Sequence, residues 1–172
     1  EICSGFFYGV LIPAILLYIN IPESQLFSYT LVGWKVSMVL DIQTVIGLGM
    51  LSVVPFCLTA NIMLANNICD LEQDVKVNRY TLPFYLGKNA LWLFAALYYI
   101  AYLSVIAMVV AGFIPPLSLL LLVTLIPVQK NINLFFKKQK KGETFIVSIK
   151  NFLMIIILHI LLIYLGSFLP GW

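Results

Sequence analysis

Long apolar segments constrain this chain more than any other feature. A helix needs about 20 apolar residues to cross a bilayer, and runs near that length recur between polar turns. Such runs must be helical, because an open strand leaves its backbone hydrogen bonds unsatisfied in lipid. The expected spans cover residues 2–19, 45–68, 90–111, 117–128 and 146–165. The sequence therefore predicts an all-α, polytopic membrane helix bundle with about five transmembrane helices, forming a single membrane domain over residues 1–172.

The composition supports the same class. Hydrophobic residues make up 62% of the chain and charged residues 10%, whereas a soluble domain carries roughly a quarter charged residues. These values exclude a soluble domain. The lipid bilayer is the expected surrounding, and nucleic acid is not an expected partner.

The basic residues orient the predicted bundle. If the spans alternate in direction, the segments 70–88 and 129–145 share one side, and Lys35 is the basic residue of the opposite side. By the positive-inside rule, the side rich in lysine and arginine faces the cytoplasm. The lysine run at 137–141 is interpreted as a topology signal or a lipid-headgroup patch, with no role in catalysis.

A cluster of amide and acidic residues follows the second span. Asn66, Asp70 and Asp74 lie four residues apart and would share one face of a helix, where two unneutralised carboxylates repel. A bound cation removes that conflict. Magnesium is a good candidate, because one or two carboxylates typically hold it together with phosphate oxygens of a ligand. Lys76 and Arg79 follow, and they are expected to meet the remaining negative charge of such a ligand.

Other polar residues leave alternatives open. Ser52 and Thr59 continue the face of Asn66 into the membrane, where they either bond neighbouring helices or line a cavity. His159 stands alone in the last span and is expected to be a hydrogen-bonded core residue rather than a ligand. The segment 27–38 is expected to be either a helix along the outer interface or an irregular loop.

The acidic cluster resembles a motif of a known family. It runs Asn66-Asn67-Ile68-x-Asp70-x-Glu72-x-Asp74, then Lys76, Arg79-x-Thr81-Leu82-Pro83 and Gly87. This pattern, directly after a membrane helix, is similar to the second aspartate-rich motif of UbiA-type intramembrane prenyltransferases. Within that superfamily it is most similar to 1,4-dihydroxy-2-naphthoate polyprenyltransferases of menaquinone biosynthesis. Cys69 and Asn78 depart from the pattern, since arginine and glycine are common there.

The resemblance implies a fold, an activity and a set of site residues. The family fold is a nine-helix bundle, and this chain resembles its C-terminal part. The implied activity is magnesium-dependent transfer of a polyprenyl group from polyprenyl diphosphate to an aromatic acceptor such as 1,4-dihydroxy-2-naphthoate, in a bacterial cell membrane. Asp70 and Asp74 would be the catalytic magnesium ligands, and Lys76 and Arg79 would bind the substrate diphosphate. Asn66 would be a supporting metal ligand or a further contact of the substrate diphosphate.

Family members also carry an earlier aspartate-rich motif, which this sequence lacks. An N-terminal half bearing that motif is therefore an expected partner, and the chain alone is expected to insert in the membrane without transferring prenyl groups. Three alternatives stay open. They are a prenyltransferase with another aromatic acceptor, a transporter or channel whose polar stripe lines an ion path, and a non-catalytic membrane subunit.

Overall fold

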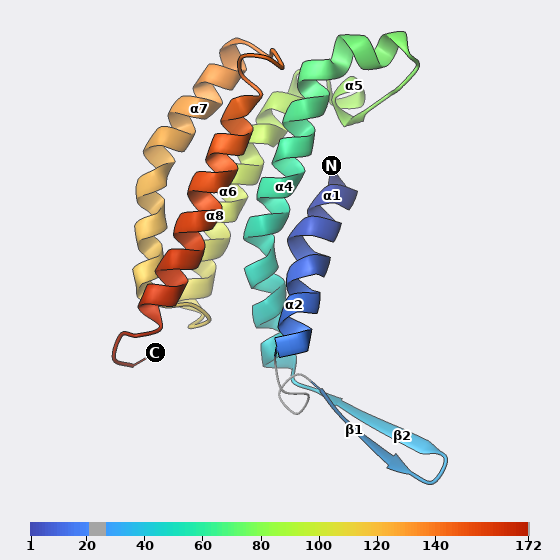
Figure 1. The fold of residues 1–172 in the computed structure, drawn as a ribbon, viewed down its shortest axis with the longest axis vertical. Coiled ribbons are helices and arrows are strands. Elements are labelled where there is room, and N and C mark those ends of the chain that lie inside the picture. Colours follow the sequence, from blue (N-terminus) through green and yellow to red (C-terminus); the bar gives the residue numbers. More distant parts are fainter. Residues whose placement is uncertain (21–26, 172) are drawn as a thin grey trace.

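The computed structural model describes residues 1–20 and 27–171, which form a bundle of long helices with a β-hairpin at one end (Figure 1). In chain order the elements are α1 (Ile2–Phe6), a π-helical turn η1 (Phe7–Leu11), α2 (Ile12–Asn20), β1 (Phe27–Val32), β2 (Lys35–Leu40), α4 (Ile42–Lys76), α5 (Leu82–Leu86), α6 (Asn89–Val110), a 3₁₀ helix η2 (Pro116–Thr124), α7 (Leu125–Lys137) and α8 (Ile146–Gly166). The prediction of an all-α membrane bundle is confirmed.

Within the described residues, four helical stretches are long and apolar enough to cross a membrane. They are Ile42–Lys76, Asn89–Val110, Pro116–Lys137 and Ile146–Gly166. The first predicted span is also helical, but its apolar stretch, Ile2–Leu16, is shorter.

The fourth span is longer than predicted. We expected it to end near residue 128, yet η2 continues into α7 as far as Lys137. Val128, Ile132 and Phe135 are buried along one side of α7, at helical spacing. The helix therefore continues as an amphipathic one after the uniformly apolar run stops. We placed the end of the span where the uniformly apolar run stops, which explains the error.

The second span is also longer than predicted, and its ends are defined by local chemistry. The carboxylate of Asp41 caps α4 by accepting a hydrogen bond from the backbone N–H of Gln43, at 3.1 Å. At the other end the chain leaves the helix through Asn78, whose φ is +57°. Asparagine tolerates this left-handed conformation, as expected for a residue at a common glycine position. The acidic cluster consequently lies on the last turns of α4 rather than in a loop.

The N-terminal helical segment packs closely against α4. A Cβ atom on Gly9 would lie 2.3 Å from the backbone nitrogen of Phe56, and one on Gly5 would lie 2.9 Å from the ring of Phe56. Gly5 and Gly9, which have no side chain, thus permit close packing of the two helical segments. α1 therefore lies alongside α4, with the N-terminus towards the end of α4 that carries the acidic cluster (Figure 1).

The prediction that residues 27–38 form a helix along the outer interface or an irregular loop is wrong. β1 and β2 form an antiparallel hairpin in which Leu31 pairs with Val36, and Thr30 pairs with Ser37. Gly33 adopts a φ of +60° in the tight turn, as two-residue hairpin turns require. The alternation of apolar and polar pairs has the period of two that strands use, and it outweighs the helical spacing of Phe27, Leu31, Trp34 and Met38.

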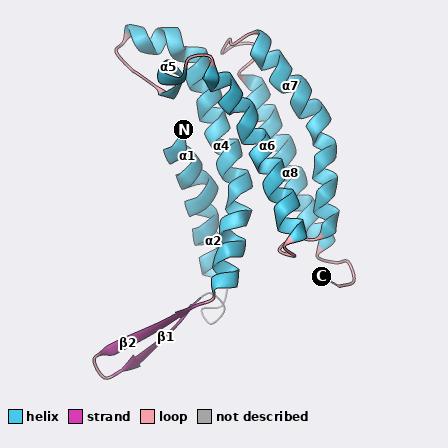
Figure 2. Ribbon diagram, turned by 180° about the vertical axis from the view of Figure 1, so that it is seen from behind, coloured by secondary structure: helices cyan, strands magenta, loops and turns pink. Residues whose placement is uncertain are grey.

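The hairpin lies at the end of the bundle opposite α5 and the turn between α7 and α8 (Figure 2). Between these ends, a core of buried side chains from α4, α6, α7 and α8 fills the bundle. Internal polar contacts tie the helices together: the Asn61 side chain donates to the Phe94 carbonyl at 2.9 Å, and the hydroxyls of Tyr102 and Thr124 lie 2.6 Å apart.

Candidate functional site

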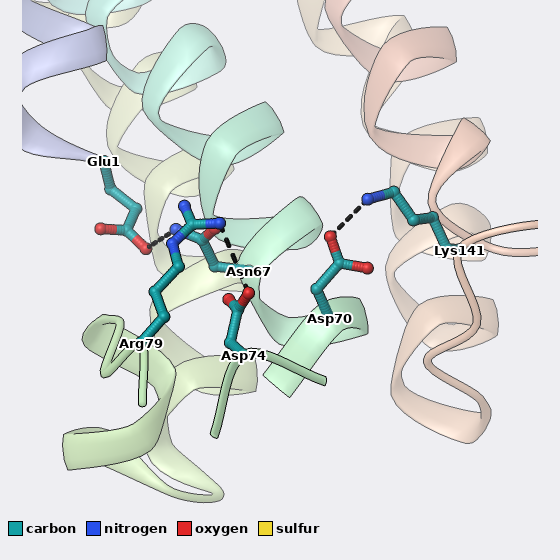
Figure 3. A network of polar contacts seen from close by, with 6 residues as sticks. All are labelled: Glu1, Asn67, Asp70, Asp74, Arg79 and Lys141. Carbon is teal, nitrogen blue, oxygen red and sulfur yellow. Dashed lines mark hydrogen bonds and ion pairs between the residues drawn. The ribbon is translucent and has the colours of Figure 1, made fainter. Parts of the chain in front are cut away.

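Two carboxylates lie on the last turns of α4, at the end of the bundle away from the hairpin. Asp70 and Asp74 are one helical turn apart, and both are buried, with 8% and 6% of their surface exposed. Buried carboxylates require cations or hydrogen-bond donors nearby. Here their partners come from different parts of the chain (Figure 3).

Asp74 is paired with Arg79 through a tight reversal of the chain. The backbone N–H of Arg79 donates to the carbonyl oxygen of Asp74 at 2.8 Å, and the left-handed Asn78 allows this return. The guanidinium Nη1 of Arg79 then lies 3.4 Å from Oδ1 of Asp74. The helix end and the turn after it therefore act as one unit that presents a carboxylate and a guanidinium together.

Asp70 is paired with Lys141, which is 71 residues away in the sequence. Lys141 lies in the turn between α7 and α8, and its ammonium contacts Oδ2 of Asp70. In Figure 3 this lysine approaches α4 from one side, whereas Arg79 and Glu1 lie on the other. Our interpretation of the lysine run as a topology signal or headgroup patch alone is therefore incomplete.

The lysines of that run have different partners. Lys138 forms an ion pair with Glu143, and the Nζ of Lys140 lies 3.9 Å from the same carboxylate. The hydrogen bond from Lys138 holds the pKa of Glu143 below its usual value. Lys141 is thus the lysine of the run whose side chain contacts α4 rather than a residue of its own turn.

Glu1 also approaches the motif. The side-chain amide of Asn67 donates to Oε1 of Glu1 at 2.7 Å, although 66 residues separate them. Glu1 is far from the acidic pair in the sequence, and the packing of α1 on α4 brings it to the motif. Asp41, by contrast, lies at the hairpin end of α4, and Glu23 falls outside the described residues.

A pocket of about 770 Å³ adjoins this network. Its walls come from the end of α4, from α5 and the start of α6, and from the turn between α7 and α8. Its charged lining residues are Asp70, Glu72, Lys88, Lys140 and Lys141. Three ammonium groups and two carboxylates around one opening suit an anionic ligand that brings a cation with it.

The other predicted site residues lie at varying distances from this pocket. Asp74 and Arg79 stand beside it rather than in its lining. Asn66 is half-buried on α4 and is also absent from the lining. Lys76 is exposed, makes no ion pair with any described residue, and borders a smaller, neighbouring pocket. The structure therefore brings Asp70, Asp74 and Arg79 together and leaves Asn66 and Lys76 at the margin.

The two carboxylates fit a magnesium ion that takes its remaining ligands from substrate. Oδ2 of Asp74 is buried without a hydrogen-bond partner, which is costly for a carboxylate unless a ligand meets it. In residues 1–20 and 27–171, no group of three or more His, Cys, Asp or Glu side chains is placed to hold a metal. A cation between Asp70 and Asp74 would depend on oxygens of a bound phosphate and water, as magnesium commonly does.

A second hollow, of about 810 Å³, lies within the apolar part of the bundle. Residues of η1, α2, α4 and α8 line it, including Ser52, Thr59 and His159. Ser52 also donates to the Leu48 carbonyl at 2.9 Å within its own helix. His159 is buried, and neither ring nitrogen has a hydrogen-bond partner among the described residues. The expectation of a hydrogen-bonded histidine is therefore wrong, because its neighbours in this hollow are mostly apolar.

A bundle of apolar helices with a charged pocket at one end is the architecture of an integral membrane protein. The sequence profile of the UbiA prenyltransferase family matches residues 2–156, and the chain belongs to this family. Comparison with curated proteins and with solved structures gives no match. Family membership implies a membrane prenyltransferase that uses a prenyl diphosphate and an aromatic acceptor. The resemblance of the motif is thus confirmed at the level of the family.

Proposed function

We propose that this chain takes part in the magnesium-dependent transfer of a polyprenyl group from polyprenyl diphosphate to 1,4-dihydroxy-2-naphthoate, in menaquinone biosynthesis. The observation that carries the proposal is the unpartnered, buried Oδ2 of Asp74, one helical turn from Asp70, with Arg79 paired with Asp74 and Lys141 paired with Asp70. The motif from Asn66 to Gly87 supports this acceptor through its likeness to the naphthoate-specific branch of the family.

In the proposed reaction, the allylic carbon–oxygen bond of the donor breaks and its electron pair leaves with the diphosphate. Asp70 and Asp74 would hold the magnesium, which when bound supplies positive charge to the departing group. Arg79 would donate hydrogen bonds to diphosphate oxygens, since a guanidinium binds such groups in a forked geometry. The electron-rich ring carbon that bears the acceptor's carboxylate then attacks the allylic carbon and forms the new carbon–carbon bond. Carbon dioxide leaves from the carboxylated carbon and restores aromaticity.

The apolar hollow is suited to the prenyl tail. Thr59 and Asp70 are 11 residues apart on α4, so they are separated by about 16 Å along the helix axis. A tail that starts at the diphosphate can run along α4 and α8 into the hollow, where apolar side chains surround it. Burial of hydrocarbon is favourable by roughly 25 cal/mol per Å², so this path would contribute to donor binding.

A segment with the earlier aspartate-rich motif is part of the proposal. A prenyl diphosphate and the two buried carboxylates are all negatively charged, and one magnesium ion together with Arg79 neutralises only part of that combined charge. In two-metal sites a second ion neutralises the other side of the reacting group. We propose that the N-terminal half of the enzyme supplies that second ion's ligands, and that residues 1–172 alone insert in the membrane without catalysing transfer.

The membrane orientation is also proposed. Lys76, Arg79, Lys88 and the lysines of the α7–α8 turn lie at the motif end, and Lys35 lies in the hairpin. By the positive-inside rule the motif end faces the cytoplasm of a bacterial cell, where phosphate metabolites are available.

The test is prenyl transfer in membranes that contain this chain with and without a segment bearing the earlier motif. Product from polyprenyl diphosphate and 1,4-dihydroxy-2-naphthoate is measured while magnesium is titrated against a chelator. We expect product only with both segments and with magnesium. Transfer to hydroxybenzoate in preference to the naphthoate would overturn the acceptor, and transfer in excess chelator would overturn the metal.

A further inference from the structure

We propose that Lys141 is an exchangeable cation of the site. It neutralises Asp70 while the donor is absent, and it passes to the diphosphate when magnesium binds Asp70. The inference rests on the proposed function, because it needs a metal and a diphosphate at the motif. It assigns a role to a residue that the motif itself does not contain.

The two partners of this ion pair differ in freedom. The side chain of Asp70 is 12% exposed and is fixed on α4, whereas the side chain of Lys141 is 56% exposed. A lysine has a flexible four-carbon stem with a compact charge at its end. The ammonium can therefore leave Asp70 by rotation of its own stem, without any movement of the buried carboxylate.

The turn that carries Lys141 is anchored on either side of it. The backbone N–H of Lys140 donates to Oγ1 of Thr144 at 2.9 Å, and the carbonyl of Lys140 accepts from the N–H of Thr144 at 2.8 Å. Lys138 and Lys140 face Glu143 within the turn. Exchange at Lys141 consequently requires no rearrangement of the backbone.

Charge balance drives the exchange. A magnesium ion and an ammonium that share one carboxylate repel each other, so binding of the metal weakens the hold of Asp70 on Lys141. The diphosphate that arrives with the metal is a stronger attractor for the released ammonium. Lys141 already lines the 770 Å³ pocket with Lys88 and Lys140, so its new partner would lie within the same pocket.

One substitution at Lys141 should change the affinity for the metal and the affinity for the diphosphate in opposite directions. Lys141→Met removes the ammonium and keeps most of the stem. Without the competing cation, the metal alone should bind more tightly. Without the third cation, the diphosphate should bind more weakly. A lysine that merely held the turn in place would not shift the two affinities in opposite directions.

The experiment uses the purified chain in detergent and two probes. Manganese(II) alone is titrated and the free ion is counted by electron paramagnetic resonance. Geranyl S-thiolodiphosphate, whose carbon–sulfur bond resists ionisation, is titrated by calorimetry at saturating magnesium. Lys138→Met is the matched control, since Lys138 belongs to the same run but pairs with Glu143. Lys141→Arg tests rescue by a retained charge.

For Lys141→Met we expect manganese to bind about twofold to fivefold more tightly, the size of an exposed ion pair. We expect the thiolodiphosphate to bind about tenfold more weakly, the loss of one charge-assisted hydrogen bond. Lys138→Met should change neither affinity, and Lys141→Arg should keep thiolodiphosphate binding near that of the unmodified chain.

Two results would overturn the proposal while leaving the metal site intact. Either both affinities stay unchanged in Lys141→Met, or both fall together, provided that Asp70→Asn still abolishes manganese binding. If the unmodified chain binds no manganese, or Asp70→Asn binds it normally, the proposed metal site fails and the role of Lys141 fails with it. Helical circular dichroism of each variant confirms that the comparison is between folded proteins.

Discussion

The two ends of α4 each present aspartate, but they use it differently. Asp41, at the hairpin end, is satisfied locally by the backbone N–H of Gln43 and the hydroxyl of Thr44. Asp74, at the motif end, keeps one buried oxygen without a partner. A carboxylate whose hydrogen bonds are satisfied by neighbouring residues stabilises the helix, whereas one with an unpartnered oxygen can still bind a ligand.

The aspartates at the two ends of α4 also differ in their exposure to solvent. Asp41 lies on the surface, where water can satisfy any remaining lone pair, but Asp70 and Asp74 are buried and depend on partners from the turn after α4 and from the α7–α8 turn. Desolvated carboxylates cost free energy unless cations meet them. The motif end therefore carries a polar arrangement that helix formation alone does not explain.

The strongest test of this difference between the two ends of α4 removes the carboxylate of Asp74, whose Oδ2 has no partner. Asp74→Ala should lower magnesium-dependent prenyl transfer by about a hundredfold or more, as is typical when a group that supports developing charge is lost. The assay uses membranes that also hold the segment with the earlier motif. Asp41→Asn is the matched control and should retain near-normal turnover. Comparable activity in Asp74→Ala would show that the unpartnered oxygen has no catalytic use.

A second prediction concerns the packing that brings Glu1 to the motif. Gly9→Val should lower the stability of the chain by about 1–3 kcal/mol, because its side chain would overlap the backbone at Phe56. Gly49→Ala is the control, since a Cβ there meets open space. Thermal unfolding in detergent measures both. Equal melting temperatures would mean that the N-terminal segment does not pack on α4 as described.

Much of this arrangement could be predicted from the sequence, because it is encoded locally. The spans follow from runs of apolar residues, and the shared face of Asp70 and Asp74 follows from a spacing of four. The left-handed turn at Asn78 follows from a residue type. Each of these depends on the conformation of a few consecutive residues, which side-chain chemistry largely determines.

The missed features depend on contacts between distant residues. Lys141 reaches Asp70 across 71 residues, and Glu1 reaches Asn67 across 66. Such pairs are set by how α1 and the α7–α8 turn pack against α4, and no local pattern distinguishes Lys141 from Lys138. The hairpin was missed for another reason: apolar residues at helical spacing also fit a period of two, and pairing of the strands decides between them.

The two cations after the acidic pair offer a finer test. Arg79→Ala should raise the apparent Michaelis constant for the prenyl diphosphate by about tenfold, because it removes a charge-assisted donor beside Asp74. Lys76→Ala should have a smaller effect, since Lys76 is exposed and borders a different pocket. The constant for the acceptor should change little in either variant. A selective acceptor defect would instead place these residues at the carboxylate of the naphthoate.

The smallest expected effect lies at the hairpin end. Asp41→Ala should lower the melting temperature slightly at pH 7 and leave prenyl transfer unchanged, because it removes a helix cap far from the motif. The hydrogen bond from Thr44 holds the pKa of Asp41 below its ordinary value of 3.8. The charged cap therefore stabilises the fold above that value, and this contribution is lost as the pH falls through the lowered pKa.

The difference in melting temperature between the unmodified chain and Asp41→Ala should accordingly shrink at pH values below about 4. Asp41→Asn is the matched control, because an asparagine caps a helix without titrating, and its melting temperature relative to Asp41→Ala should depend little on pH. Reduced prenyl transfer in Asp41→Ala, at a temperature where the variant is folded, would contradict the division between the two ends of α4. The hairpin end would then have to influence the site through α4, the continuous helix that connects Asp41 with Asp74.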